Sequence, residues 1–264
     1  MDASAPIVLF DTGIGGLTVY DAVRRAVPDA PIVYAADYAG MPYGMKTEAE
    51  VAARVSGLLG RICERFAPRL ACIACNTAST IALGMVREVL EIPVVGTVPA
   101  IKTAAQKTRS GTIAMIGTKG TIRQPYIDDL EREFASGKTL LRIAAPDFVE
   151  EAETKLRGHA VDQSVIAEAT NRLRAMPGGD AIDAVVLSCT HFPLLREELG
   201  KELGPDVDLI DGAEGIARRI AALLGGQEFA KPNQNRFVLT GPLDRAVGLE
   251  AALANRGFDN PESF

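Results

Sequence analysis

The chain has 264 residues, of which 47% are hydrophobic and 23% charged, and its formal net charge is −6 at pH 7. This length suits one large or two modest domains, while a negative charge without clustered Lys and Arg excludes a general nucleic-acid surface. The apolar runs fall short of the roughly 18 residues of a membrane span and the N-terminus lacks a signal-peptide pattern, so we expect a cytoplasmic protein without membrane contacts.

Short β-rich runs alternate with helical periodicity along the chain, which is typical of an α/β fold with parallel sheets. The expected strands are residues 7–10, 32–36, 70–74, 94–95, 112–116, 140–144, 184–188, 207–210 and 237–240. Between the second and third strands, apolar residues recur with helical spacing and predict an amphipathic helix. These residues are Val51, Val55, Leu58, Leu59, Ile62 and Phe66. Cys63 adjoins this stripe and is interpreted as a packing residue.

The two halves of the chain contain a faint internal repeat. Phe10-Asp11-Thr12-Gly13 corresponds to Ile116-Gly117-Thr118-Lys119, and the strand ending at Cys75 corresponds, at a similar spacing, to the strand ending at Cys189. We therefore expect two related half-units with a cleft at the carboxyl ends of their sheets, where open α/β folds bind ligands.

A glycine-rich segment, Asp11-Thr12-Gly13-Ile14-Gly15-Gly16, follows the first strand. It is not a dinucleotide fingerprint, because Thr18 stands where the third glycine is needed, and it lacks the Gly-Lys-Ser/Thr ending of a phosphate loop. An aspartic protease needs a second Asp-Thr-Gly, which Asp211-Gly212-Ala213 does not supply. Two interpretations stay open: Asp11 caps backbone amides of a strand-to-helix turn, or Asp11 and Thr12 face a polar or cationic ligand.

The four cysteines, at positions 63, 72, 75 and 189, are expected to be thiols in a reducing compartment. Cys72 and Cys75 have the spacing of a redox pair, but a thioredoxin-like pair begins at a helix start and these two follow an apolar strand. A zinc site needs two further ligands, and only His159 and His191 exist, far apart in the sequence. Residues three apart on a strand face opposite sides, so we expect Cys72 in the core and Cys75 at the strand tip.

Cys75 and Cys189 share one kind of setting, because each ends an apolar strand and precedes a polar strand-to-helix turn. The polar residues of these turns are Asn76, Thr77, Ser79, Thr190 and His191. Backbone amides at such turns favour a carboxylate, and the positive end of a helix favours the thiolate form of a cysteine. One thiolate can then abstract a proton beside a carboxylate while a thiol on the far face returns one, which is racemisation. No metal, flavin or Schiff-base site is predicted.

With these motifs the chain resembles the cofactor-independent glutamate racemases. The matching segments are residues 10–19, 42–44, 74–79, 116–118 and 189–195. The resemblance implies an α/β fold of two pseudo-twofold-related domains, each a mainly parallel sheet flanked by helices, with a cleft between them. The first domain would comprise residues 1–98 plus 211–264, and the second residues 99–210. The implied enzyme is a cofactor-independent isomerase that interconverts L-glutamate and D-glutamate, supplies D-glutamate for peptidoglycan, and forms a homodimer.

The resemblance also implies a role for each matching residue. Cys75 is expected to act on the D-enantiomer and Cys189 on the L-enantiomer. The further catalytic residues are expected to be Asp11, His191 and Glu153. The expected substrate-binding residues are Asp11, Thr12, Pro42, Tyr43, Gly44, Asn76, Thr77, Thr118, Thr190 and His191.

Within this set, the resemblance divides the substrate between several groups. Asn76, Thr77 and Thr190 would bind the α-carboxylate. Tyr43 and Gly44 would bind the side-chain carboxylate and so read the length of the substrate. Asp11 and Thr12 would lie near the ammonium group.

Two of these assignments, Thr12 and Glu153, rest on weaker matches, and one further residue, Asp37, has no assigned role. The family usually has Ser where this chain has Thr12, which keeps the hydroxyl. Glu150 and Glu151 compete with Glu153 for the place beside the second cysteine. Asp37 occupies a position that the family often makes acidic, and a solvated loop residue is the equal alternative.

Other functions stay open. An aspartate or hydantoin racemase of the same superfamily would share the cysteine pair, although Pro42-Tyr43-Gly44 and the run 189–195 favour glutamate. From other classes, the chain could be a non-catalytic binder of small carboxylates, or a redox protein that uses Cys72 and Cys75.

Overall fold

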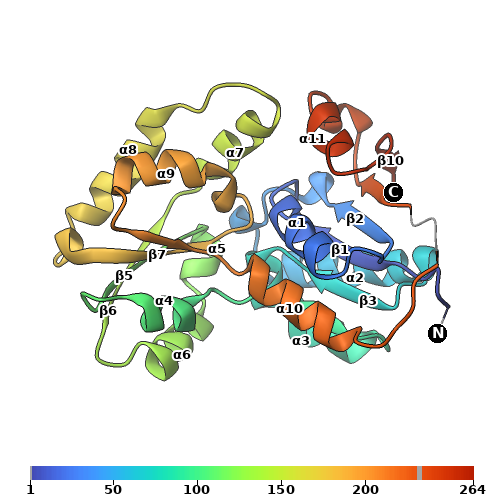
Figure 1. The fold of residues 1–264 in the computed structure, drawn as a ribbon, viewed down its shortest axis with the longest axis horizontal. Coiled ribbons are helices and arrows are strands. Elements are labelled where there is room, and N and C mark those ends of the chain that lie inside the picture. The colour runs from blue at the N-terminus through green and yellow to red at the C-terminus, as the bar shows by residue number, and fades with distance from the viewer. Residues whose placement is uncertain (1, 231–233) are drawn as a thin grey trace. The chain divides into compact units, whose positions relative to one another are not determined.

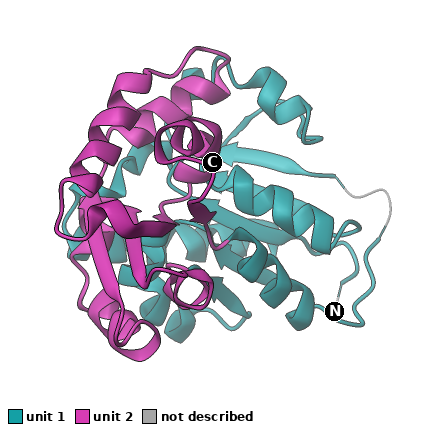
Figure 2. Cartoon of the chain, turned by 60° about the vertical axis from the view of Figure 1, so that its left-hand side comes forward, with its two compact units in different colours: residues 1–97, 213–264 teal, residues 98–212 magenta. Residues whose placement is uncertain are grey.

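Two parallel β-sheets form the framework of the chain, each in its own compact unit (Figure 1, Figure 2). The computed structural model describes residues 2–230 and 234–264. Unit 1 comprises Met1–Thr97 and Ala213–Phe264, and unit 2 comprises Val98–Gly212. Every strand pairing recorded between the named strands is parallel, which confirms the predicted α/β class.

The sheet of unit 1 has the strand order β10-β9-β2-β1-β3-β4. Its strands are β1 (Ile7–Asp11), β2 (Ile32–Ala36), β3 (Leu70–Ile73), β4 (Val94–Gly96), β9 (Arg236–Leu239) and β10 (Glu262–Ser263). Every residue of β1, β2 and β3 is buried. These strands form continuous apolar runs because helices cover both faces of a parallel sheet.

The four longer helices of unit 1 pack in two pairs, α2 with α3 and α1 with α10. The helices of this unit are α1 (Leu17–Ala26), α2 (Glu48–Phe66), α3 (Asn76–Val89), α10 (Ala213–Leu223) and the short α11 (Glu250–Ala254). The predicted stripe of α2 packs against alternate residues of the sheet such as Val8 and Phe10, with Leu58 and Phe66 at its partly buried margin. Cys63 is half-buried beside this stripe, and burial raises its pKa to about 11, as expected for a packing residue.

Unit 2 has a four-stranded sheet in the order β6-β5-β7-β8. Its strands are β5 (Thr112–Gly117), β6 (Thr139–Ala144), β7 (Ile182–Ser188) and β8 (Asp208–Ile210). Its helices are α4 (Ile101–Lys107), α5 (Lys119–Ile122), α6 (Pro125–Phe134), α7 (Phe148–Leu156), α8 (Gln163–Arg174) and α9 (Arg196–Leu203). One face of the sheet packs on α4 and α6, and the other on α7, α8 and α9.

The two sheets share one strand order, since β2-β1-β3-β4 corresponds to β6-β5-β7-β8. In each unit the chain starts on an inner strand, goes to one neighbour, and then crosses to the other side. The direction of winding therefore changes between β1 and β3 in unit 1 and between β5 and β7 in unit 2. Open α/β sheets bind ligands at the carboxyl ends of such switch points. The repeated topology agrees with the internal repeat in the sequence.

All nine predicted strands are present, with ends within two residues of those observed. No sequence pattern predicts β10, because Glu262–Ser263 is a pair of polar residues that forms a strand only through its pairing with β9. Short 3₁₀ turns also escaped prediction, including η1 (Tyr38–Gly40), η2 (Tyr43–Met45) and η4 (Phe192–Leu195).

Two substitutions on α2 test this packing. Leu59→Ala is expected to lower the free energy of unfolding by about 2–5 kcal/mol, because Leu59 is fully buried and its loss leaves a cavity. Gly57→Ala, on the exposed face where a Cβ meets no atom within 4 Å, is expected to raise it by up to about 1 kcal/mol. Urea denaturation followed by circular dichroism measures both changes. A Leu59→Ala variant as stable as the parent protein would contradict the packing described.

Candidate active site

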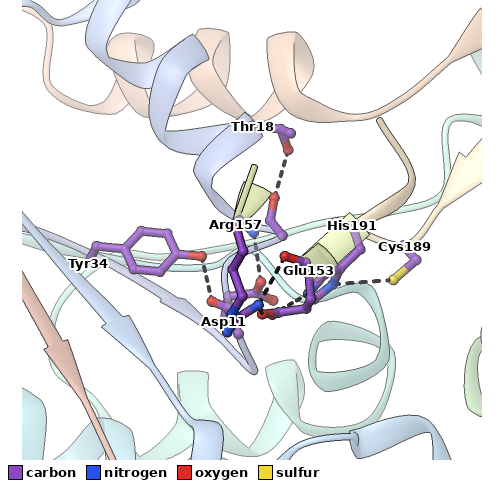
Figure 3. Close-up of polar contacts among 10 residues, drawn as sticks. Asp11, Thr18, Tyr34, Glu153, Arg157, Cys189 and His191 are labelled. Carbon is purple, nitrogen blue, oxygen red and sulfur yellow. Dashed lines mark hydrogen bonds and ion pairs between the residues drawn. The ribbon is translucent and has the colours of Figure 1, made fainter. Parts of the chain in front are cut away.

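The switch point of unit 1 begins at Asp11, the last residue of β1, which is completely buried. Its Oδ2 accepts a hydrogen bond from the Gly16 amide at 2.7 Å, and the Tyr34 hydroxyl donates to the Gly13 carbonyl at 2.8 Å (Figure 3). A Cβ on Gly16 would lie 2.8 Å from the Tyr34 hydroxyl oxygen and 3.0 Å from the Asp11 Cβ, so the turn closes only with glycine there. Asp11 therefore caps the turn, as one of the two interpretations expected, and Thr12 follows it as a buried residue.

Cys75 lies at the neighbouring strand end. It is the N-cap residue of α3 and is 6% exposed, and its Sγ accepts a hydrogen bond from the Ala78 amide at 3.4 Å. Asn76 and Thr77 form the buried first turn of α3, where backbone amides and the helix dipole favour an anion. Because β1 and β3 are paired up to Phe10 and Ile73, this turn and Asp11 lie at the same edge of the sheet.

Cys72 lies within β3, whereas Cys75 is the N-cap residue of α3. Cys72 is completely buried, and burial raises its pKa to about 12. Its neighbours Ala71 and Ile73, together with Cys75, belong to the core that packs on α2 and α3. The four cysteines are all free thiols. A redox pair needs a reactive, accessible thiolate, so the environment of Cys72 argues against the redox alternative.

The segment after β2 places Tyr43 in the core, 2% exposed, between exposed Pro42 and half-buried Gly44. The Tyr43 hydroxyl donates to Asp37 at 2.6 Å. Burial and the neighbouring Asp37 raise the pKa of Tyr43, so its hydroxyl stays protonated and acts as a donor.

The interpretation of Asp37 as a solvated loop residue is wrong. Asp37 is completely buried and forms an ion pair with Arg54. Burial alone would raise the pKa of this carboxyl group, but hydrogen bonds from Arg54, Thr240 and Tyr43 outweigh that effect and lower it. The residue is therefore a buried, ionised carboxylate.

The switch point of unit 2 holds Cys189, directly after β7 and 8% exposed. Its Sγ lies 3.9 Å from Nδ1 of His191, and Nε2 of His191 lies 3.2 Å from Oε1 of Glu153 (Figure 3). The other oxygen of Glu153 accepts a hydrogen bond from Arg157 Nη1 at 2.5 Å. A thiol, an imidazole, a carboxylate and a guanidinium thus form one continuous row.

Thr118 and Thr190 complete this edge of unit 2. Thr118 follows β5 and is the N-cap residue of α5, where its hydroxyl accepts a hydrogen bond from the Thr121 amide at 3.2 Å. Thr190 is buried between the cysteine and the histidine of the row. Because β5 and β7 pair up to Gly117 and Ser188, both threonines lie at the carboxyl end of the same strand pair.

Two neighbours in the row of unit 2, His191 and Glu153, favour each other's charged form. Burial would lower the pKa of His191, but the hydrogen bonds and charges of Cys189 and Glu153 outweigh burial and raise it to about 10. Burial likewise opposes ionisation of Glu153, yet His191 and Arg157 outweigh it and lower the pKa of Glu153. His191 is consequently an imidazolium at neutral pH, and Glu153 is its carboxylate partner.

Of the three competing glutamates, the structure brings Glu153 to His191. Glu150 is exposed, and Glu151 accepts a hydrogen bond from the Asp162 amide at 2.8 Å. Sequence reasoning missed Arg157, although Glu followed by Arg four residues later is the spacing of an ion pair along a helix.

Within residues 2–230 and 234–264, His, Cys, Asp and Glu side chains form no group of three suited to holding a metal ion. Across that same part of the chain, no helix combines the length and the apolar character needed to cross a bilayer.

Comparison with known proteins identifies the family. The family model described as Asp/Glu/Hydantoin racemase matches residues 15–220. The chain belongs to this racemase family. Among racemases with similar sequences, the glutamate racemase of Sphingopyxis alaskensis is 63% identical over 223 residues, covering 84% of this chain and 83% of that protein. The glutamate racemase of Glaesserella parasuis is 40% identical over 231 residues, covering 87% and 85%.

Solved racemase structures share the fold. The crystal structure of Escherichia coli glutamate racemase in complex with L-glutamate and the activator UDP-MurNAc-Ala superposes with a TM-score of 0.91. It is 38% identical and covers 98% of each chain. The glutamate racemase isoform RacE1 of Bacillus anthracis gives a TM-score of 0.86 at 29% identity, covering 100% of this chain and 98% of that one.

The charge state of His191 is directly testable, because the chain has only two histidines. Nitrogen NMR of the ¹⁵N-histidine-labelled protein, with His159→Gln to assign the signals, is expected to show His191 titrating near pH 10. Glu153→Gln is expected to move this titration down towards the ordinary value of about 6.5, because the carboxylate that favours the imidazolium is gone. Lys155→Gln on the same helix is the control. A parent protein whose His191 titrates near pH 6.5 would contradict the electrostatic description.

The same pKa shift predicts how stability depends on pH. Since the folded-state pKa of His191 is raised to about 10, its contribution to stability is fully present below about pH 6.5 and is lost as the pH rises through 10. The free energy of unfolding is therefore expected to fall less between pH 6.5 and 10 in His191→Asn than in the parent protein. Urea titrations at several pH values measure this difference, and equal slopes would refute it.

Proposed function

We propose that the protein interconverts L-glutamate and D-glutamate by two-base proton transfer at Cα, with Cys75 and Cys189 as the two bases. The observation that carries the proposal is their equivalent placement. Each sulfur follows the corresponding strand of one unit, β3 or β7, at the switch point of its sheet. The relatives named glutamate racemase, and the similar structure that contains L-glutamate, support glutamate as the substrate.

The proposed proton transfer balances without a cofactor. In the D-to-L direction, the Cα–H bond breaks as the Cys75 thiolate takes the proton and becomes a thiol. The Cys189 thiol then gives its proton to the opposite face of Cα and becomes a thiolate. The reverse direction exchanges the two roles, so each turnover leaves the pair ready for the other enantiomer. This chemistry requires both sulfurs to reach one Cα.

The chief difficulty is that an amino-acid α-proton is far less acidic than a thiol. Without an electron sink such as pyridoxal phosphate, the protein has to stabilise the carbanion through its surroundings. Hydrogen-bond donors on the α-carboxylate, a charged ammonium group and the exclusion of water all serve that purpose. We assign the α-carboxylate to Asn76, Thr77 and Thr190, and the ammonium group to Asp11 and Thr12.

The two bases have different surroundings. Cys75 accepts a hydrogen bond from the first turn of α3, whose dipole favours a negative charge. Cys189 instead lies beside His191, and Glu153 keeps that imidazole protonated. We propose that His191 stabilises the Cys189 thiolate, and that Glu153 acts through His191 without touching the substrate.

Recognition of the side-chain carboxylate is proposed for the segment Pro42-Tyr43-Gly44, with Thr118 as a further polar contact. The distance between the two carboxylates distinguishes glutamate from the shorter aspartate. A firmly placed segment at this position would therefore read the length of the substrate.

The wider setting follows from the substrate. D-glutamate supplied by this reaction would serve peptidoglycan synthesis in the cytoplasm. We further propose that the two compact units are the two domains expected from the sequence, and that the protein acts as a homodimer.

Isotope exchange tests the proposed reaction. In heavy water, the parent protein is expected to incorporate deuterium at Cα of both glutamate enantiomers without any added cofactor, as followed by proton NMR. Cys75→Ser and Cys189→Ser are each expected to lower the rate of racemisation by about 10²–10⁴-fold, because each removes one of the two acid/base groups.

Cys72→Ser is the matched control, since Cys72 lies three residues from Cys75, within β3, and is completely buried. It is expected to keep the parental rate. Deuterium exchange into aspartate or a hydantoin in place of glutamate would overturn the substrate assignment. Activity that survives in both Cys75→Ser and Cys189→Ser would overturn the mechanism.

A further inference from the structure

The Asp37 carboxylate in unit 1 is saturated with hydrogen bonds. Its Oδ2 accepts from the Tyr43 hydroxyl at 2.6 Å and from Arg54 Nε at 2.5 Å. Its Oδ1 accepts from Arg54 Nη2 at 2.6 Å and from Thr240 Oγ1 at 2.5 Å. An ionised carboxylate offers about four acceptor positions, and these four donors occupy them. Asp37 therefore has no capacity left for a substrate ammonium group, and its role is within the protein.

These bonds join parts of unit 1 that are far apart in the sequence. Asp37 follows β2, Arg54 lies on α2, and Thr240 follows β9. The Thr240 hydroxyl also accepts a hydrogen bond from the Ala39 amide at 3.1 Å. The Asp37 amide in turn donates to the Asp11 carbonyl at 2.8 Å, which ties the cluster to the end of β1.

Gly40 fits this cluster so closely that a side chain has no room. A Cβ on Gly40 would overlap Asp37 Oδ2 and Arg54 Nε, and would lie 2.8 Å from Cε1 of Tyr43. The 3₁₀ turn η1 thus folds directly over the ion pair. This close approach fixes the chain just before Pro42-Tyr43-Gly44.

We propose that Arg54 and Thr240, acting through Asp37, are positioning residues that hold the Tyr43–Gly44 backbone for the side-chain carboxylate of glutamate. The inference rests on the proposed function. Because the Tyr43 hydroxyl is bonded to Asp37, the donors that this segment offers a ligand are its backbone N–H groups. The placement of those groups then depends on the cluster beneath them, and so does the affinity for the substrate.

Arg54→Lys tests the inference, because a lysine cannot reproduce the two-pronged contact of a guanidinium with a carboxylate. The KM for both enantiomers is expected to rise about ten-fold while kcat changes by less than about three-fold, since the segment binds the substrate but takes no part in proton transfer. Thr240→Val is expected to raise KM by about three-fold, and Thr240→Ser, which keeps the hydroxyl, to restore the parental value.

Arg256→Lys is the matched control within unit 1. Arg256 contacts Asp21 with the same two nitrogens, Nε and Nη2, both at 2.8 Å. It is expected to lower Tm about as much as Arg54→Lys does and to leave KM unchanged. If both variants lose Tm but only Arg54→Lys raises KM, the effect on KM comes from positioning of the substrate-binding segment and not from a general loss of stability.

Gly40→Ala provides a second test that removes no polar group, because its methyl group displaces the ion pair by steric overlap alone. It is expected to raise KM as Arg54→Lys does, while Gly57→Ala leaves KM unchanged. Calorimetric titration with D-glutamate gives the same comparison for any variant with slow turnover.

Two results would be decisive against the inference. If Arg54→Lys, Thr240→Val and Gly40→Ala all keep the parental KM and lose only Tm, the cluster is a structural element and the inference is wrong while the proposed function stands. If the parent protein neither binds nor exchanges glutamate, the proposed function fails and this inference fails with it.

Discussion

Parallel pairing of β1 with β3, and of β5 with β7, determines where the candidate side chains of each unit can lie. Both faces of these strands are buried under helices, so polar side chains are tolerated only where the strands end. Parallel strands that are paired in register end at the same edge of a sheet. Asp11 and Cys75 are therefore neighbours by topology in unit 1, and Thr118 and Cys189 are neighbours in unit 2.

The buried charges of the two units are balanced in different ways. In unit 1, the Asp37 carboxylate accepts hydrogen bonds from one guanidinium and two hydroxyl groups, which makes a closed cluster. In unit 2, the row runs from Arg157 through Glu153 and His191 and ends at the Cys189 sulfur. An unpaired buried charge is strongly destabilising, so the closed cluster around Asp37 suits a supporting role within the protein.

The sequence predicts the strands and the cysteine environments well, because a strand buried on both faces is a continuous apolar run and the polar turn after it interrupts that run sharply. It predicts the contacts of charged side chains poorly. The sequence does not distinguish Glu153 from Glu150 and Glu151 as the partner of His191; the structure does, because only Glu153 on α7 faces His191.

The contacts of charged side chains are hard to predict because the interacting partners can be far apart along the chain. Asp37 and Thr240 are far apart in the sequence, and a threonine hydroxyl carries no local signal of such a contact. No local pattern around Asp37 indicates burial, whereas the i, i+4 spacing of Glu153 and Arg157 is an ion-pair signal within one helix.

The discontinuity of unit 1 has a consequence for how the protein is made. On a translating ribosome, the β2 edge and the Asp37 carboxylate are complete only after β9 and Thr240 have emerged. Unit 2, contiguous from Val98 to Gly212, has all its strands before then. Between the synthesis of β2 and that of β9, the nascent chain thus exposes an unpaired strand edge of unit 1, and such edges attract aggregation and the help of chaperones.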